Sequence, residues 1–162
     1  MRRILCCLLA LLTLAVAGRV PTRAEGSPVL LTVSGRLGAP APRELTLPDL
    51  EALRPHSVRT TTPWTDGVQE FTGVRLRDLL AAVGAQGHTL AMTALNDYTV
   101  EIPASDASAY DVIVAYRRNG QAMPVRDKGP LWIIYPYDQH GELRDAEHQA
   151  RMIWQLRRID VR

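Results

Sequence analysis

The apolar residues of this chain are concentrated in short runs, and this spacing is the feature that most restricts its fold. β-branched and aromatic residues favour strands, and Gly, Pro, Asn or Asp separate the runs. Six runs are typical of strands: VLLTVSG, SVRTTT, TLAMTAL, YTVEIP, DVIVAYRR and LWIIYPY, at residues 29–35, 57–62, 89–95, 98–103, 111–118 and 131–137. The closing segment, residues 151–162, alternates and is predicted as one more strand, with Trp132 and Trp154 assigned to packing. The pattern predicts an α+β fold of strand-rich mixed sheets with a few short helices.

Two helices are expected between these strands. In residues 46–53, Thr46 is a candidate N-cap, and Asp49 three positions later completes a capping box. Residues 73–85 carry an apolar stripe and end at Gly84, which is typical of a C-terminal cap. The stripe has i, i+3, i+4, i+7 spacing and consists of Leu76, Leu79, Leu80 and Val83.

Turn signals mark the remaining connections. Asn119-Gly120 predicts a tight hairpin, and Asn96-Asp97 predicts a turn between two strands. Residues 65–73 are interpreted as a turn with a short extended piece, and residues 138–150 as a polar loop or brief helix. Residues 105–110 are compatible with one helical turn capped by Ser105.

The first 24 residues have the pattern of a signal peptide. Arg2 and Arg3 precede an apolar segment, residues 4–17, that is shorter than the roughly 20 residues needed to span a bilayer. We expect cleavage after Ala24 rather than after Ala17, because Pro21 breaks the helix before it. The predicted organisation is a signal peptide at 1–24 and a single domain at 25–162, in the periplasm or secreted. A retained membrane anchor is the alternative.

Cleavage at this point changes the charge and the thiol content. All 17 acidic residues but only 15 of the 19 basic residues follow Ala24, so the net charge becomes 15 − 17 = −2. This balance argues against a nucleic-acid partner. Cys6 and Cys7 are removed with the signal, which leaves no thiolate as a nucleophile or metal ligand.

Nucleophilic catalysis has little support in the sequence. The sequence has no Gly-x-Ser-x-Gly elbow and no Gly-rich phosphate loop. His140 and His148 stand near acidic residues, but their spacing matches no metal template, and a solvated loop is the preferred interpretation. Two polar clusters remain: Asn96 and Tyr98 beside a turn, and Arg126 with Lys128 beside Gly129. The second is either an anion site or a solvated turn.

The order of these segments resembles the molybdopterin-binding domain of the sulfite oxidase family, which includes the periplasmic methionine sulfoxide reductase catalytic subunit. The resemblance covers residues 29–162. It rests most on FTGVRLRDLL and NGQAMPVRDKGPL, at residues 71–80 and 119–131. The fold it implies is the mixed α+β fold of that family, and the second segment resembles one near the pterin and its phosphate.

The resemblance also implies a position for the molybdenum ligand. Active members carry a cysteine shortly before the F-x-G-V run and a few residues ahead of a tryptophan. Counted back from Trp64, that position falls on Thr60 or Thr61, so this chain has threonine in either alignment. A neutral hydroxyl is a poor substitute for a soft thiolate on molybdenum. We therefore expect no bound cofactor. The cofactor that the resemblance would imply is molybdopterin.

Three functions follow as hypotheses. The first is an exported, non-catalytic ligand-binding, sensor or accessory protein, with a small-molecule ligand or a membrane-bound periplasmic partner. The second is a molybdopterin-dependent oxidoreductase with non-cysteine ligation, and the third is an interaction module without a ligand. The first predicts that Thr60, Trp64 and Asn96 converge on one cavity, and the ligand-pocket interpretation fails if they do not. Its candidate pocket residues are Thr60, Thr62, Trp64, Asn96, Tyr98, Arg126, Lys128 and Tyr135.

Overall fold

The computed structural model describes residues 26–38 and 42–162. The expected signal peptide, with both cysteines and the cleavage position at Ala24, lies outside the described residues. Within the part of the chain that is described, no helix has the length and apolar character needed to cross a membrane.

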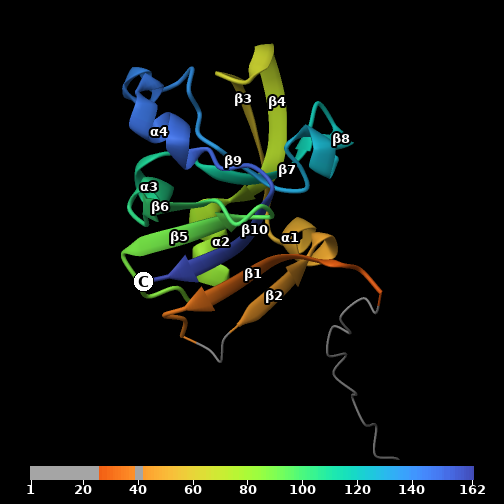
Figure 1. Ribbon diagram of the computed structural model, residues 1–162, viewed down its shortest axis with the longest axis vertical. Helices are drawn as coiled ribbons and strands as arrows, with labels where there is room; N and C mark the ends of the chain where they lie inside the picture. Colours follow the sequence, from red (N-terminus) through yellow and green to blue (C-terminus); the bar gives the residue numbers. More distant parts are fainter. Residues whose placement is uncertain (1–25, 39–41) are drawn as a thin grey trace, which may run out of the picture.

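One mixed sheet joins the first and last strands of the domain (Figure 1). In the order β2-β1-β10-β5-β6, β1 pairs with β10 in parallel and the other neighbours pair antiparallel. Because β10 lies at the centre of this sheet, the residues just before it are held against the neighbouring strands. The five strands are β1 (Val29–Gly35), β2 (Arg43–Thr46), β5 (Thr89–Ala94), β6 (Thr99–Pro103) and β10 (Leu156–Val161).

A second sheet, entirely antiparallel, carries the long hairpin seen at the top of Figure 1 beside α4. Its order is β3-β4-β7-β8, with β9 also paired to β7. The predicted hairpin at Asn119-Gly120 is confirmed, since both residues have the positive φ, 50° and 76°, that a tight hairpin turn uses. The strands are β3 (Pro55–Thr62), β4 (Thr65–Arg75), β7 (Ile113–Arg118), β8 (Gln121–Ala122) and β9 (Trp132–Ile134).

The helices are short and connect the strands. The capping box at Thr46 and Asp49 is confirmed, and the predicted apolar stripe of α2 is buried. Gly84 follows α2 with φ +66°, the left-handed conformation expected of a helix cap. The α-helices are α1 (Leu47–Ala52), α2 (Leu76–Ala82), α3 (Asp106–Ala109) and α4 (Ala146–Arg151), and the 3₁₀ helices are η1 (Val125–Asp127) and η2 (Gly141–Arg144). The predicted α+β class is thus confirmed.

Buried side chains from both sheets form one hydrophobic cluster. At its centre Phe71 of β4 meets the fully buried Trp132 of β9 edge to face, with ring centroids 5.4 Å apart. Gly73 lies two residues after Phe71, where a Cβ atom would stand 2.1 Å from the carbonyl oxygen of Val114. The F-x-G-V run therefore combines a core aromatic ring with a glycine that allows β4 and β7 to approach closely.

Several element boundaries differ from those predicted; β9, for example, covers only Trp132–Ile134 of the strand predicted at 131–137. Residues 65–73 belong to the eleven-residue strand β4, and α2 begins only at Leu76, because Arg75 keeps an extended backbone and pairs with Ile113. The last strand begins at Leu156, since Gln155 has φ +53° and donates its backbone N–H to the carbonyl of Lys128. The alternation predicted from residue 151 onward is therefore wrong before Leu156.

Candidate functional site

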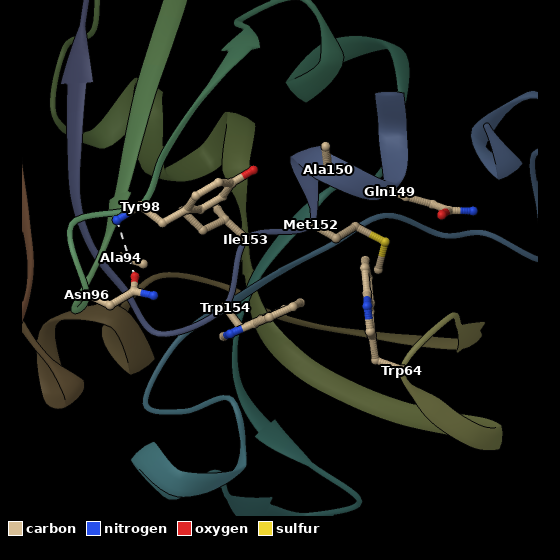
Figure 2. A pocket seen from close by; sticks show the side chains of 9 residues that line it. All are labelled: Trp64, Ala94, Asn96, Tyr98, Gln149, Ala150, Met152, Ile153 and Trp154. Atoms are coloured by element: carbon tan, nitrogen blue, oxygen red, sulfur yellow. Dashed lines mark hydrogen bonds between the residues drawn. The ribbon is translucent and has the colours of Figure 1, made fainter. Parts of the chain in front are cut away.

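A cavity of about 340 Å³ opens where three segments meet: the β3–β4 turn, the β5–β6 turn and the link from α4 to β10. Figure 2 shows its lining, which is mainly aromatic and apolar with two carboxamides. No lining residue among those described carries a charge. The lining residues are Trp64, Ala94, Asn96, Tyr98, Gln149, Ala150, Met152, Ile153 and Trp154.

Trp64 reaches the cavity from the turn between β3 and β4. Its backbone N–H donates to the Thr62 hydroxyl at 3.2 Å, and that hydroxyl lies 2.8 Å from the hydroxyl of Thr65. The Trp64 ring is half-buried and meets Trp154 edge to face, with centroids 5.3 Å apart. The small hydroxyls of this stretch thus fix the turn, and the indole forms the cavity wall.

Asn96 and Tyr98 reach the cavity from the β5–β6 turn. Asp97 between them has φ +65°, a conformation that Asp tolerates, and its carboxylate pairs with Arg157 of β10. The Asn96 Oδ1 atom accepts the backbone N–H of Tyr98 at 3.2 Å (Figure 2). This bond fixes the amide so that Nδ2 is turned toward Trp154.

The third wall of the cavity is held in place by a buried ion pair between Arg151 of α4 and Asp106 of α3. Arg151 donates to the Asp106 carboxylate at 2.9 Å, and the Tyr135 hydroxyl donates to the same oxygen at 2.7 Å. Both charged side chains are nearly buried, with exposed fractions of 12% and 10%. Burial, followed by the hydrogen bond to Asp106, raises the pKa of Tyr135 well above its ordinary value, so the phenol stays a neutral donor.

The chain between α4 and β10 is also held by hydrogen bonds from β9. Trp132 donates its indole N–H to the carbonyl of Met152 at 3.0 Å, and Ile133 donates its backbone N–H to the carbonyl of Ile153 at 2.9 Å. These bonds position Met152 and Trp154 against the cavity. This wall of the cavity is therefore fixed to β9 of the second sheet.

A separate cluster surrounds Thr60, and we call Thr60, Thr61, Asp138 and Arg144 the Asp138 clasp. The fully buried Thr60 hydroxyl accepts the backbone N–H of Asp138 at 3.1 Å and donates to the carbonyl of Thr61 at 3.2 Å. The Asp138 carboxylate accepts the Thr61 N–H and hydroxyl, each at 2.7 Å, and pairs with Arg144 at 2.9 Å. The Thr61 hydroxyl is the first of the contacts that hold the pKa of Asp138 below its usual value.

The structure brings together three of the eight candidate pocket residues: Trp64, Asn96 and Tyr98. Thr60 does not line the cavity, because its side chain is buried in the Asp138 clasp. The convergence of Thr60, Trp64 and Asn96, on which the ligand-pocket interpretation of the sequence rested, is therefore wrong; the cavity in the structure is a different one, formed by Trp64, Asn96 and Tyr98 with α4 and Trp154. Trp154, which we assigned to packing, is half-buried and lines the cavity, because Gln155 turns the chain before β10 starts.

Four further candidates also lie away from the cavity lining. Thr62 is buried and bonded within the β3–β4 turn, and Tyr135 is buried against Asp106. Arg126 is exposed on η1, whereas the Lys128 ammonium lies over the rings of Trp132 and Trp154, 5.6 and 5.7 Å from their centroids. Gly129 offers no open backbone, since a Cβ there would stand 1.8 Å from the carbonyl of Met123.

No pattern in the sequence marks the remaining lining residues as part of a binding site. Gln149 and Ala150 belong to the polar segment predicted as a loop or brief helix, and they reach the cavity because this segment forms α4, which packs near β6. In the same segment His148 bonds to Asp145 and packs on Tyr135. No group of three or more metal-ligating side chains occurs in the described part of the chain.

Comparisons with known proteins identify the relatives of this fold. The sequence matches the family model described as oxidoreductase molybdopterin binding domain over residues 17–139. No curated protein matches the chain in sequence. In structure the chain is similar to the sulfane dehydrogenase SoxCD of Paracoccus pantotrophus, with a TM-score of 0.60 and 19% sequence identity.

The extent of each match limits what it shows. The likeness to SoxCD covers 81% of this chain and 37% of that chain, so it shows the fold and spans only a minor part of the larger protein. The family match ends at residue 139 and so includes Trp64, Asn96 and Tyr98, whereas the α4–β10 wall of the cavity lies beyond it. Because the match covers most of the sequence, the chain belongs to the oxidoreductase molybdopterin-binding domain family, of the sulfite oxidase type.

Proposed function

We propose that this protein is an exported, non-catalytic member of the family that binds a small molecule in the cavity beside Trp64. In this role it acts as a sensor or accessory protein for a membrane-bound periplasmic partner. The export pattern of residues 1–24 supports the location. The aromatic lining and two carboxamides support the ligand, because small-molecule sites are concave, mostly apolar and carry a few polar groups.

The proposal that the protein is non-catalytic rests on the hydrogen bonding of the Thr60 and Thr61 hydroxyls. Either stands where the family resemblance places a molybdenum-ligating thiolate. Both are already engaged in the Asp138 clasp, and Thr60 is fully buried. A neutral hydroxyl is a poor ligand for an oxo-molybdenum centre, and these two would first have to give up their hydrogen bonds.

The rest of the donor set also fails to fit molybdopterin. The two cysteines of the sequence, Cys6 and Cys7, lie in the expected signal peptide. A pterin phosphate needs cationic partners; the cation of the Asp138 clasp, Arg144, is already paired with Asp138 at 2.9 Å. Arg126 is exposed on η1, and the Lys128 ammonium lies over the rings of Trp132 and Trp154, so neither belongs to the cavity lining. The residues present therefore do not fit the cofactor.

A ligand screen on the mature domain tests this proposal. A diverse small-molecule library is screened by thermal shift, and each hit is repeated on Tyr98→Ala and Val68→Ala. Tyr98 and Val68 are similarly exposed, at 52% and 55%, but only Tyr98 lines the cavity. We expect hits whose stabilisation is lost in Tyr98→Ala and kept in Val68→Ala. A screen without such a hit would contradict ligand binding at this cavity.

A further inference from the structure

We propose that the cavity takes a planar aromatic ligand with a carbonyl or carboxylate oxygen, and does not take an organic cation. This inference names the ligand class of the function proposed above and rests on it. Several aromatic rings around a cavity suit two kinds of ligand: a flat ring that packs on them, or a cation attracted to their negative faces. The charges and hydrogen-bond donors around the cavity distinguish these two.

The first observation is the position of Lys128. Its ammonium lies over the Trp154 ring, 5.7 Å from the centroid, and over Trp132 at 5.6 Å, but Lys128 is not part of the cavity lining. The Trp154 ring therefore already interacts with one cation from outside the cavity. That cation draws π density from the ring, which leaves the Trp154 surface less attractive to a second cation and better matched to an electron-rich ring.

The second observation is the set of free donors. The Asn96 Oδ1 atom accepts from Tyr98, so the amide presents its Nδ2 donor to the cavity, on the side of Trp154 (Figure 2). Among the described residues, the indole N–H groups of Trp64 and Trp154 have no acceptor, whereas that of Trp132 is bonded to Met152. Figure 2 places the Trp154 nitrogen on the side facing Asn96. These donors match an oxygen acceptor on the ligand. The Gln149 carboxamide and the Tyr98 hydroxyl also line the cavity and can donate or accept, so they fit either kind of ligand.

The third observation is the absence of a carboxylate in the lining. The acidic residues within two positions of the lining are Asp66, Asp97 and Glu147. Asp97 and Glu147 are paired with Arg157 and Arg151, and Asp66 is exposed near the start of β4 and does not line the cavity. A site for a desolvated cation would need an unpaired carboxylate or open aromatic faces. The described lining offers no carboxylate, and one of its aromatic rings, Trp154, already interacts with Lys128 from outside the cavity.

Four small probes separate the alternatives: benzamide, benzoate, benzyltrimethylammonium and cyclohexanecarboxamide. Dissociation constants are measured by ligand-observed NMR on the mature wild-type domain. We expect benzamide and benzoate to bind, and the organic cation and the non-planar amide to bind at least about tenfold more weakly. If the cation binds more tightly than benzamide, or the non-planar amide binds equally well, the inference is overturned.

Two variants test the residues that carry the argument. Asn96→Asp keeps the oxygen that accepts the Tyr98 N–H but replaces the Nδ2 donor by an acceptor. We expect it to weaken benzamide about tenfold with little change in Tm. Lys128→Met removes the outer cation, and we expect it to raise the affinity for benzyltrimethylammonium relative to benzoate. Unchanged affinities in both variants would overturn the inference.

The outcome also separates this inference from the proposed function. If none of the four probes binds while the library screen yields ligands sensitive to Tyr98→Ala, the ligand class is wrong and the binding function stands. If neither probes nor library compounds bind at the cavity, both fail.

Discussion

At the scale of single residues, hydrogen bonds explain what Thr60, Thr61 and Thr62 do in residues 57–67, SVRTTTPWTDG. Thr60 and Thr61 tie the end of β3 to the loop after β9, and Thr62 fixes the turn that presents Trp64. None of the three hydroxyls is free. Trp64 is the residue of this stretch that reaches the cavity.

The clasp makes stability depend on pH. Its hydrogen bonds lower the folded pKa of Asp138 below the usual value of 3.8, so the stabilisation is fully present above that value and is lost as the pH falls through the lowered pKa. We expect Asp138→Asn to be less stable than wild type at neutral pH, with a difference that shrinks on acidification. Urea unfolding from neutral to acid pH measures this.

A second variant identifies the source of the effect. Thr61→Val removes the hydroxyl that contributes most to the lowered pKa of Asp138 but keeps the carboxylate. It should show part of the same loss at neutral pH. A stability difference between wild type and Asp138→Asn that stays constant over the whole pH range would contradict this role.

At the scale of elements, α4 depends on one buried ion pair. Arg151 sits at its last turn and meets Asp106 of α3, which also accepts the Tyr135 hydroxyl. Because Gln149 and Ala150 stand on the same short helix and line the cavity, the ion pair positions part of the site. A helix of six residues has little stability of its own and relies on such tertiary contacts.

Removing one partner of this pair should be costly. Arg151→Met leaves the Asp106 carboxylate buried without its cation, and we expect a loss of about 3 kcal/mol in the free energy of unfolding. The control is Arg162→Met, because Arg162 pairs with Glu101 at the surface, where both side chains are more than half exposed. This control should lose less than about 1 kcal/mol. Equal losses in the two variants would show that the Arg151 pair is not a buried anchor.

Sequence patterns predicted the local elements better than the site. The α2 stripe, the Thr46 capping box and the Asn119-Gly120 hairpin are set by residues close in sequence, and all three are confirmed. The wall formed by α4 and the link to β10 could not be predicted from the sequence. Its residues come to line the cavity only because β10 pairs at the centre of the first sheet. The candidate residues near Trp64 were partly misplaced for the same reason. Alternation shows which face of β3 is buried, but it does not show that Asp138 covers Thr60.

At the scale of the whole molecule, the cavity lies where the two sheets approach each other. The second sheet supplies Trp64, the first supplies Asn96 and Tyr98, and the link between α4 and β10 closes the gap. The family scaffold is thus retained around a cavity with a neutral aromatic lining, while the position expected for a metal-binding thiol is occupied by a hydrogen-bonded threonine. We propose that this member of the family does not hold molybdopterin.

The most direct test is the molybdenum and pterin content of the protein. The full chain is expressed in a host that makes the cofactor and the protein is purified. Molybdenum per protein and pterin fluorescence after oxidative denaturation are then measured. Thr60→Cys is measured beside the wild type, because it restores a thiol at the position implied by the family. We predict that the wild type carries neither molybdenum nor pterin above background, and that any gain is confined to Thr60→Cys. Stoichiometric molybdenum with pterin in the wild type would contradict the account.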